Sequence, residues 1–111
     1  MERVVRAYSR YGREAVRVLG QAIRINRLER KLSVAELAER VGVSRDMMRR
    51  IEAGDPRCAI GVAFEAASIV GVTLFEEDRS NLTMRLAEHD EKLRLLPKAI
   101  HKARTTVKDD F

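Results

Sequence analysis

Basic and hydroxyl side chains that could contact nucleic acid lie close together between residues 44 and 50. A helical period of 3.6 residues places Arg45, Arg49 and Arg50 on one side of a helix. A guanidinium can donate two parallel hydrogen bonds to O6 and N7 of guanine, and a serine at a helix start can reach a phosphate or a base edge. The segment therefore predicts a DNA-contacting surface formed by Ser44, Arg45, Asp46, Met47, Arg49 and Arg50.

The residue types that catalysis or metal binding requires are scarce. The chain has one cysteine, Cys58, and two histidines, too few for a zinc site of the usual kind without carboxylates. It has no glycine-rich phosphate loop, nucleophile elbow or metalloprotease motif. We therefore expect no enzyme, no metal site and no cofactor, and we interpret Cys58 as a small filler residue rather than a reactive thiol.

Two short helices joined by a glycine turn must position the arginine surface. Ser33 and Glu36 can satisfy each other's backbone amides in a capping box, which predicts a helix that begins there and ends at Gly42. Ser44 is the cap of a second helix, which ends before the glycine and proline of residues 53–56. This second helix must bury one stripe so that its opposite side is open to DNA, and the predicted stripe is formed by Met48 and Ile51.

Helical spacing recurs on both sides of this pair, and strand signals are almost absent. We expect further helices over residues 15–31, 59–70 and 78–97, so the predicted fold class is all-α. The predicted organisation is a basic N-terminal extension over 1–14, a helix-turn-helix domain over 15–77, a C-terminal helix over 78–97 and a flexible tail over 98–111.

The basic charge is concentrated near the N-terminus. Residues 1–30 hold eight arginines against three glutamates within a chain of net charge +5, which favours an anionic partner such as nucleic acid. Helical spacing would place five of these side chains in one row. The row could follow phosphates, enter a minor groove as an arm, face a protein partner or be solvated, and residues 1–12 could be helix or arm. The row is formed by Arg3, Arg6, Arg10, Arg13 and Arg17.

Residues 19–75 resemble the XRE family of regulators, whose DNA-binding domain is lambda-repressor-like. The resemblance depends on four motifs: Leu-Ala-Glu at 37–39, Gly-Val-Ser at 42–44, Arg-Ile-Glu-Ala-Gly at 50–54 and Gly-Val-Thr-Leu-Phe at 71–75. It implies a compact five-helix domain that binds a near-palindromic, double-stranded DNA operator as a homodimer.

The resemblance also implies which residues contact DNA. Arg45, Asp46 and Arg50 match positions at which family members contact bases. Ser44 and the backbone over 59–61 match positions that contact phosphates. The full set of candidate DNA-contacting residues is Ser33, Ser44, Arg45, Asp46, Met47, Arg49, Arg50, Ala59 and Gly61.

Three further positions have meaning only within the family. Arg27 and Glu52 match a structural ion pair that links the first helix to the end of the recognition helix. Val34 departs from the family pattern, which often has a DNA-contacting glutamine there. Because valine cannot make that hydrogen bond, one anchoring contact is missing, and more of the positioning falls to the arginines.

A narrower similarity is to HipB-like antitoxins. It depends on residues 54–72, on Leu-Leu-Pro-Lys at 95–98 and on the closing Asp-Asp-Phe. Such antitoxins bind a HipA-type serine/threonine kinase toxin and repress the operon that encodes both proteins. The resemblance therefore implies a kinase toxin as a partner.

The predicted C-terminal helix has an apolar stripe that Pro97 ends. Its positions are spaced 4, 3, 4 and 3, which makes two heptads, too few for a free-standing coiled coil. The stripe could pack on its own domain or form a dimer seam. It consists of Leu82, Leu86, His89, Leu93 and Leu96.

These features together favour a DNA-binding transcriptional repressor, the antitoxin of a toxin–antitoxin operon. The alternatives are a protein-interaction module that neutralises a partner enzyme without specific DNA recognition, and a standalone phage-type regulator. No apolar run approaches the roughly 20 residues that span a bilayer, and no secretory signal is apparent. A single cysteine excludes an internal disulfide, so we expect a cytoplasmic protein without a membrane partner.

Overall fold

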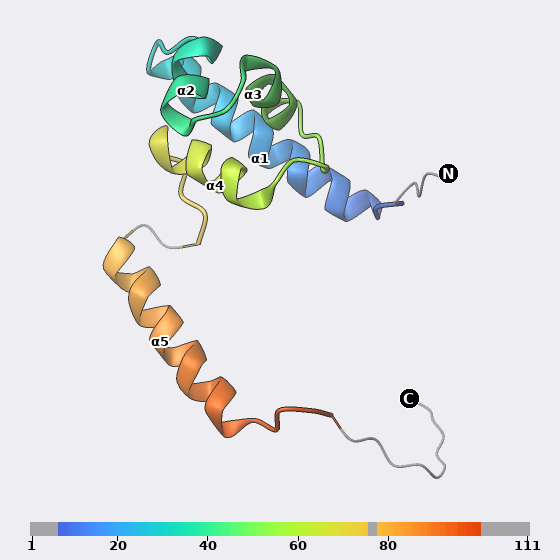
Figure 1. Ribbon diagram of the computed structural model, residues 1–111, viewed down its shortest axis with the longest axis vertical. Coiled ribbons are helices and arrows are strands. Elements are labelled where there is room, and N and C mark those ends of the chain that lie inside the picture. Colours follow the sequence, from blue (N-terminus) through green and yellow to red (C-terminus); the bar gives the residue numbers. More distant parts are fainter. Residues whose placement is uncertain (1–6, 76–77, 101–111) are drawn as a thin grey trace. The chain divides into compact units, whose positions relative to one another are not determined.

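The computed structural model describes residues 7–75 and 78–100, and these residues form five helices and no strand (Figure 1). The predicted all-α class is confirmed. The chain divides into two compact units, Met1–Leu74 and Phe75–Phe111. Four helices belong to the first unit, and the predicted C-terminal helix is the fifth. Among the residues described in the first unit there is no fifth helix of the kind that the XRE resemblance implies.

The first unit consists of α1 (Arg10–Glu29), α2 (Val34–Val41), α3 (Arg45–Glu52) and α4 (Ile60–Ile69). The two short helices α2 and α3 pack on each other, and α1 and α4 close the bundle against them (Figure 1). Each helix contributes one apolar stripe to the centre, as an amphipathic helix in a small domain must. The buried apolar residues are Ile23, Leu37, Ala38, Met48, Ile51, Ala66, Ala67 and Val70.

Helix α1 begins earlier than its apolar spacing predicts. Ser9 is its cap and accepts a hydrogen bond from the backbone N–H of Gly12, so the helix starts at Arg10 rather than near Ala15. Residues 10–14 of the predicted extension are therefore helical, and Arg10, Arg13 and Arg17 are exposed on α1. Arg3 and Arg6 lie outside the described residues.

Both ends of α2 have the predicted chemistry. Ser33 Oγ accepts from the Glu36 N–H at 3.0 Å, and the Glu36 carboxylate accepts from the Ser33 N–H at 2.7 Å, which confirms the capping box. These bonds lower the pKa of Glu36. Gly42 ends α2 with φ of 90°, a left-handed conformation that a residue with a Cβ rarely adopts.

Helix α1 and the end of α3 approach each other at Gly20. A Cβ atom at this position would lie 2.5 Å from the carbonyl oxygen of Ile51 and 2.7 Å from that of Glu52. Only glycine permits this approach, because any other residue would overlap the backbone of α3. This contact determines where along α1 the end of α3 packs.

The second unit contains α5 (Arg79–Leu95), close to the predicted limits of 78–97. Asp78 is its cap and accepts from the Ser80 N–H at 2.9 Å, which lowers the pKa of Asp78. All side chains of α5 that the structure describes are exposed. Residues 98–100 of the predicted tail are not helical, and residues 101–111 lie outside the described part. None of the helices in the described ranges is long and apolar enough to cross a bilayer.

Candidate nucleic-acid interface

Helix α3 has one face in the core and one in solvent. Its inner face is held by Met48 and Ile51, which are almost fully buried. Its outer face exposes Arg45, Asp46 and Arg49. The division follows from the helical period, since positions 45 and 49 are one turn apart on the side opposite the buried pair. This arrangement leaves two guanidinium groups at the surface of a helix whose orientation the core determines.

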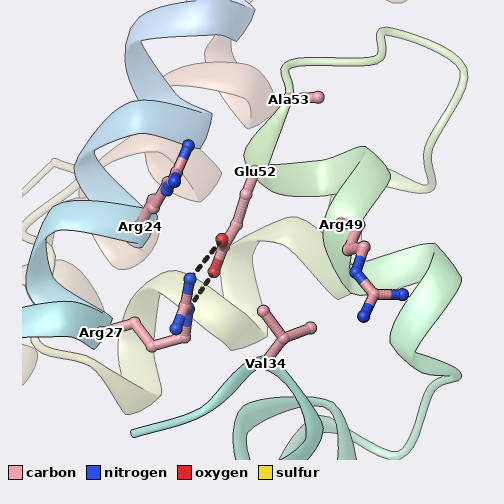
Figure 2. A pocket seen from close by; sticks show the side chains of 6 residues that line it. All are labelled: Arg24, Arg27, Val34, Arg49, Glu52 and Ala53. Carbon is pink, nitrogen blue, oxygen red and sulfur yellow. Dashed lines mark hydrogen bonds and ion pairs between the residues drawn. The ribbon is translucent and has the colours of Figure 1, made fainter. Parts of the chain in front are cut away.

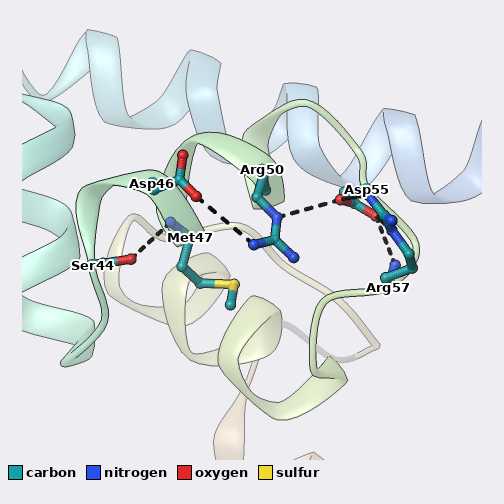
Figure 3. A network of polar contacts seen from close by, with 6 residues as sticks. All are labelled: Ser44, Asp46, Met47, Arg50, Asp55 and Arg57. Atoms are coloured by element: carbon teal, nitrogen blue, oxygen red, sulfur yellow. Dashed lines mark hydrogen bonds and ion pairs between the residues drawn. The ribbon is translucent and has the colours of Figure 1, made fainter.

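The three arginines of α3 have different surroundings. Within the described part of the chain, no carboxylate lies within ion-pair distance of Arg45 or Arg49. Arg50 lies between two carboxylates, 3.8 Å from Asp46 and 3.4 Å from Asp55 (Figure 3). Its guanidinium is therefore held in place, and its charge is partly compensated.

Asp55 joins the end of α3 to the following loop. It accepts from the Arg57 backbone N–H at 2.9 Å and from the Arg57 guanidinium at two distances of 3.0 Å (Figure 3). These bonds, with the weaker one from Arg50, hold the pKa of Asp55 far below its ordinary value of 3.8. This network was not predicted from the sequence. Its signal is the order Asp-Pro-Arg at 55–57, because an aspartate often accepts from the amide two residues later in a turn.

Ser44 and Met47 lie at the start of α3. Ser44 Oγ accepts from the Met47 N–H at 3.0 Å, so it caps the helix as expected and retains its own O–H as a donor (Figure 3). The Met47 side chain is half-buried rather than fully outward. The serine is therefore available to an acceptor such as a phosphate, whereas the methionine is shared between surface and core.

Arg27 and Glu52 lie side by side in the interior, although 25 residues separate them. Arg27 donates from Nε to Glu52 Oε2 at 2.7 Å and from Nη2 to Oε1 at 3.0 Å (Figure 2). The two residues are only 6% and 8% exposed. Nη1 of Arg27 also donates to the Leu32 carbonyl at 2.9 Å. The pair thus links α1, the loop before α2 and the end of α3.

A hollow of about 280 Å³ opens above this pair. Figure 2 shows its lining, in which exposed arginines from α1 and α3 lie around an apolar residue at the start of α2. Val34 is that apolar residue, at the position where the family resemblance would place a DNA-contacting glutamine. Arg24 was not among the predicted contact residues; its signal in the sequence is its place one turn before Arg27. The lining residues are Arg24, Arg27, Val34, Arg49, Glu52 and Ala53.

The other candidates lie at helix starts. Ser33 is exposed, with its hydroxyl engaged in the capping box of α2. Ala59 precedes α4 and offers no side-chain cap, so no side chain satisfies the first amides of α4. Gly61 is exposed, and nothing lies within 4 Å of an ideal Cβ there. Such a helix start can approach a phosphate closely.

The described residues contain no group of three histidine, cysteine or acidic side chains that could hold a metal ion. Cys58 is half-buried, and burial raises the pKa of its thiol. The thiol therefore stays protonated and is a poor nucleophile at neutral pH.

Comparisons with known proteins agree with this geometry. A family model described as a helix-turn-helix domain matches residues 18–82, more than half of the chain. No significant match was found among curated proteins or among solved structures. The matched segment contains α2, the Gly42 turn and α3, the elements that place the arginines at the surface. The chain therefore belongs to the helix-turn-helix domain family.

Proposed function

We propose that this protein binds double-stranded DNA in a sequence-specific manner, with α3 in the major groove, and represses transcription. The observation that supports this most is the exposure of Arg45 and Arg49 on a helix whose opposite side is locked in the core. An α-helix fits the major groove, and an arginine there can distinguish guanine by two hydrogen bonds.

The surroundings of the arginines suggest different roles. Arg45 and Arg49 can reorient toward bases without first breaking an ion pair. Arg50, held by Asp46 and Asp55, loses less side-chain freedom on binding but must share its charge. We assign Arg45 and Arg49 to base contacts. We assign Arg50 to a DNA contact in which Asp46 and Asp55 determine the direction of its guanidinium.

Phosphate contacts would come from groups at helix starts. We assign this role to the Ser44 hydroxyl, at the start of α3, and to the amides that follow Ala59, which have no side-chain cap. Ser33 lies at the start of α2 and belongs to the same set, and Arg24, across the hollow from Arg49, would add a basic group from α1. Contacts of this kind position the protein on the duplex without distinguishing sequences.

A gel shift with the DNA upstream of the protein's own gene, against scrambled DNA of equal length, tests the proposal. Arg45→Ala should weaken specific binding by about 1–3 kcal/mol and relax the base preference at one position. The matched control is Arg30→Ala, which removes the same charge from an exposed residue. The Arg30 side chain lies beside Gly71, which follows α4. Equal losses in both variants, or equal binding to scrambled DNA, would contradict specific recognition by α3.

The homodimer and the operator belong to the same proposal. A near-palindromic site would have half-sites one helical turn, or a multiple, apart, each occupied by one copy. Footprinting of the retarded complex measures this spacing. A single protected half-site would contradict binding as a dimer.

A second candidate is an antitoxin that binds and restrains a HipA-type kinase toxin, as the narrower resemblance implies. One observation favours a protein surface near α3: Asp46 and Asp55 compensate part of the arginine charge. The antitoxin could also act without specific DNA recognition, as an interaction module. Co-purification of a kinase with a variant in which Arg45, Arg49 and Arg50 are all alanine would support separate surfaces for DNA and protein. Failure of the unchanged protein to retain any kinase would favour a standalone regulator.

A further inference from the structure

An apolar groove opens on the first unit beside the end of α3. Its volume is about 210 Å³, and it lies between α1, the loop after α3 and α4. All of its lining residues belong to one unit, so the packing of that unit determines its shape. It shares no lining residue with the hollow above the Arg27–Glu52 pair. Its apolar walls are formed mainly by Val16, Leu19, Ile51, Ile60, Ala63 and Phe64.

The polar side chains that line the groove are Asp55 and Cys58. Asp55 Oδ1 accepts from the backbone N–H and Nε of Arg57, and Oδ2 accepts from Nη2 of Arg57 and Nε of Arg50. A carboxylate has about four lone-pair sites, so Asp55 has no acceptor left for a ligand, and a thiol is only a weak donor. The part of a ligand that enters the groove must therefore be apolar.

Arg57 places a positive charge at the edge of the groove. Its neighbours Pro56 and Cys58 line the groove, and its guanidinium is bonded to Asp55, which lines it too (Figure 3). The Arg57 side chain is 73% exposed. Its bonds to Asp55 use Nε and Nη2, and no hydrogen bond within the described residues uses Nη1. The Nη1–Nη2 edge can therefore donate two parallel hydrogen bonds to a second carboxylate.

The charges around this edge favour an anion. Arg17 packs against the residue before Asp55, and Arg50 and Arg57 both donate to Asp55. Asp46, 3.8 Å from Arg50, is the second carboxylate of this group. Three guanidiniums against two carboxylates leave one positive charge, which a ligand with one negative charge would neutralise.

We propose that the groove binds a compact aromatic monocarboxylate, with its ring against the apolar walls and its carboxylate on Arg57. A cavity of about 150 Å³ holds benzene, so a groove of about 210 Å³ accommodates a substituted ring or two fused rings. A rigid ring also loses less conformational freedom on binding than a flexible chain of the same size. The site goes beyond the proposed function, because it recognises a small molecule rather than DNA.

Asp55 connects this site to the proposed DNA-contacting surface. A ligand carboxylate on Arg57 weakens the attraction between Arg57 and Asp55, so Asp55 attracts Arg50 more strongly. Arg50 then has less charge to offer DNA, and the ligand adds a negative charge that repels phosphates. The bound acid therefore weakens DNA binding. This consequence rests on the proposed function, whereas binding of the acid does not.

Titration of the full chain with 2-naphthoate, followed by the NMR shifts of backbone amides, tests the site without DNA. The amides of the loop after α3 and of the first turn of α4 should shift until the site is saturated. 2-Naphthamide has the same rings and no charge, and it should bind about tenfold more weakly or worse, because it cannot form the pair with Arg57. Equal binding of the two probes would overturn the proposal. Shifts scattered over arginines throughout the chain would mean non-specific association and would also overturn it.

Two variants with matched controls locate the ligand. Arg57→Ala should weaken 2-naphthoate binding about tenfold or more, whereas Arg30→Ala removes the same charge elsewhere and should have no effect. Ala63→Leu fills the groove and should abolish binding, whereas Ala35→Leu adds the same volume on the exposed side of α2. The amide spectrum identifies a variant that has unfolded. Undiminished binding by a folded Arg57→Ala or Ala63→Leu variant would overturn the assignment.

A gel shift with 2-naphthoate at saturation tests the connection to DNA. The DNA affinity of the unchanged protein should fall by about fivefold or more, and that of Arg57→Ala should not respond to the acid. An affinity that the acid leaves unchanged would overturn the regulatory consequence. If the protein binds no DNA at all, the proposed function fails, while the NMR titration still decides whether the groove binds the acid.

Discussion

Arg27 and Glu52 form a bidentate ion pair in the interior of the helix-turn-helix unit, and the pair connects α1 to the end of α3. Replacing Glu52 with glutamine would leave the Arg27 guanidinium buried without a counter-charge. We expect a loss of about 3–5 kcal/mol in the free energy of unfolding, measured by urea denaturation.

Two controls separate burial from charge pairing. Arg10→Ala breaks the Arg10–Glu14 pair on the exposed part of α1, where a loss of at most about 0.5 kcal/mol is expected. The double variant Arg27→Met/Glu52→Leu should be more stable than Glu52→Gln, because it removes both buried charges. Equal stability of Glu52→Gln and the unchanged protein would refute the structural role of the pair.

The contact at Gly20 predicts a strong effect of one methyl group. Gly20→Ala should destabilise the domain by about 1–3 kcal/mol or more, since its Cβ would overlap the Ile51 carbonyl. Gly61→Ala is the matched control in α4, where the added Cβ has open space. There the higher helix propensity of alanine should stabilise by about 0.5–1 kcal/mol. Thermal melts of both variants measure the contrast, and a shift in the same direction would contradict the close approach.

The lowered pKa of Asp55 predicts that the stability of the protein depends on pH. Its pKa is lowered in the folded protein by the Arg57 hydrogen bonds, so the folded state favours the charged form. The resulting stabilisation is fully present above the unfolded pKa of about 3.9 and is lost as pH falls toward the folded value. We expect the unchanged protein to lose more stability between pH 5 and pH 3 than Asp55→Asn, by urea midpoints. Glu39→Gln, on the exposed side of α2, should retain the full pH dependence.

Two substitutions at Ser44 separate capping from DNA contact. Ser44→Ala removes the hydrogen bond to the Met47 N–H and should cost about 1 kcal/mol of stability. Ser44→Asp preserves a good cap but adds a negative charge where a phosphate is expected. We expect Ser44→Asp to melt close to the unchanged protein yet to bind DNA more weakly than Ser44→Ala in a gel shift. The reverse order of affinities would place Ser44 away from the phosphates.

Val34 offers a prediction of increased affinity. Val34→Gln supplies a side chain that can hydrogen-bond an adenine edge, and we expect operator binding to tighten by about 1 kcal/mol, roughly fivefold. Val34→Leu has no such group and serves as the control. Titration of the operator in a gel shift measures both variants. If the glutamine and leucine variants bind equally, residue 34 faces no base.

Local chemistry explains why the caps of α2 and α3 could be predicted from sequence. The Ser33–Glu36 capping box, the left-handed Gly42 and the Ser44 cap depend on neighbours within four residues, and the structure has all three. The apolar spacing predicts a start of α1 near Ala15, which is too late, because the helix begins after the polar Ser9 cap. Element ends are determined by caps more than by apolar periodicity.

The electrostatic details of the candidate site could not be predicted in the same way. That Arg50 lies between Asp46 and Asp55 depends on how the loop after α3 folds back. The hollow that Arg24 and Arg49 share depends on how α1 and α3 cross at Gly20. Both are consequences of packing between segments distant in sequence. The DNA-contacting roles of the candidate residues remain predictions.

The separation of the two faces of α3 has a consequence for how this protein can diversify. The inner residues Met48, Ile51 and Glu52 fix the helix, whereas Arg45, Asp46 and Arg49 contribute little to the core. Surface substitutions away from packing features usually change stability by less than about 0.5 kcal/mol. If α3 contacts DNA as proposed, a new target sequence can be acquired by changes at these three outer positions while the scaffold stays the same. Under that proposal, descendants of one ancestral gene would come to recognise different DNA sequences without passing through unstable intermediates.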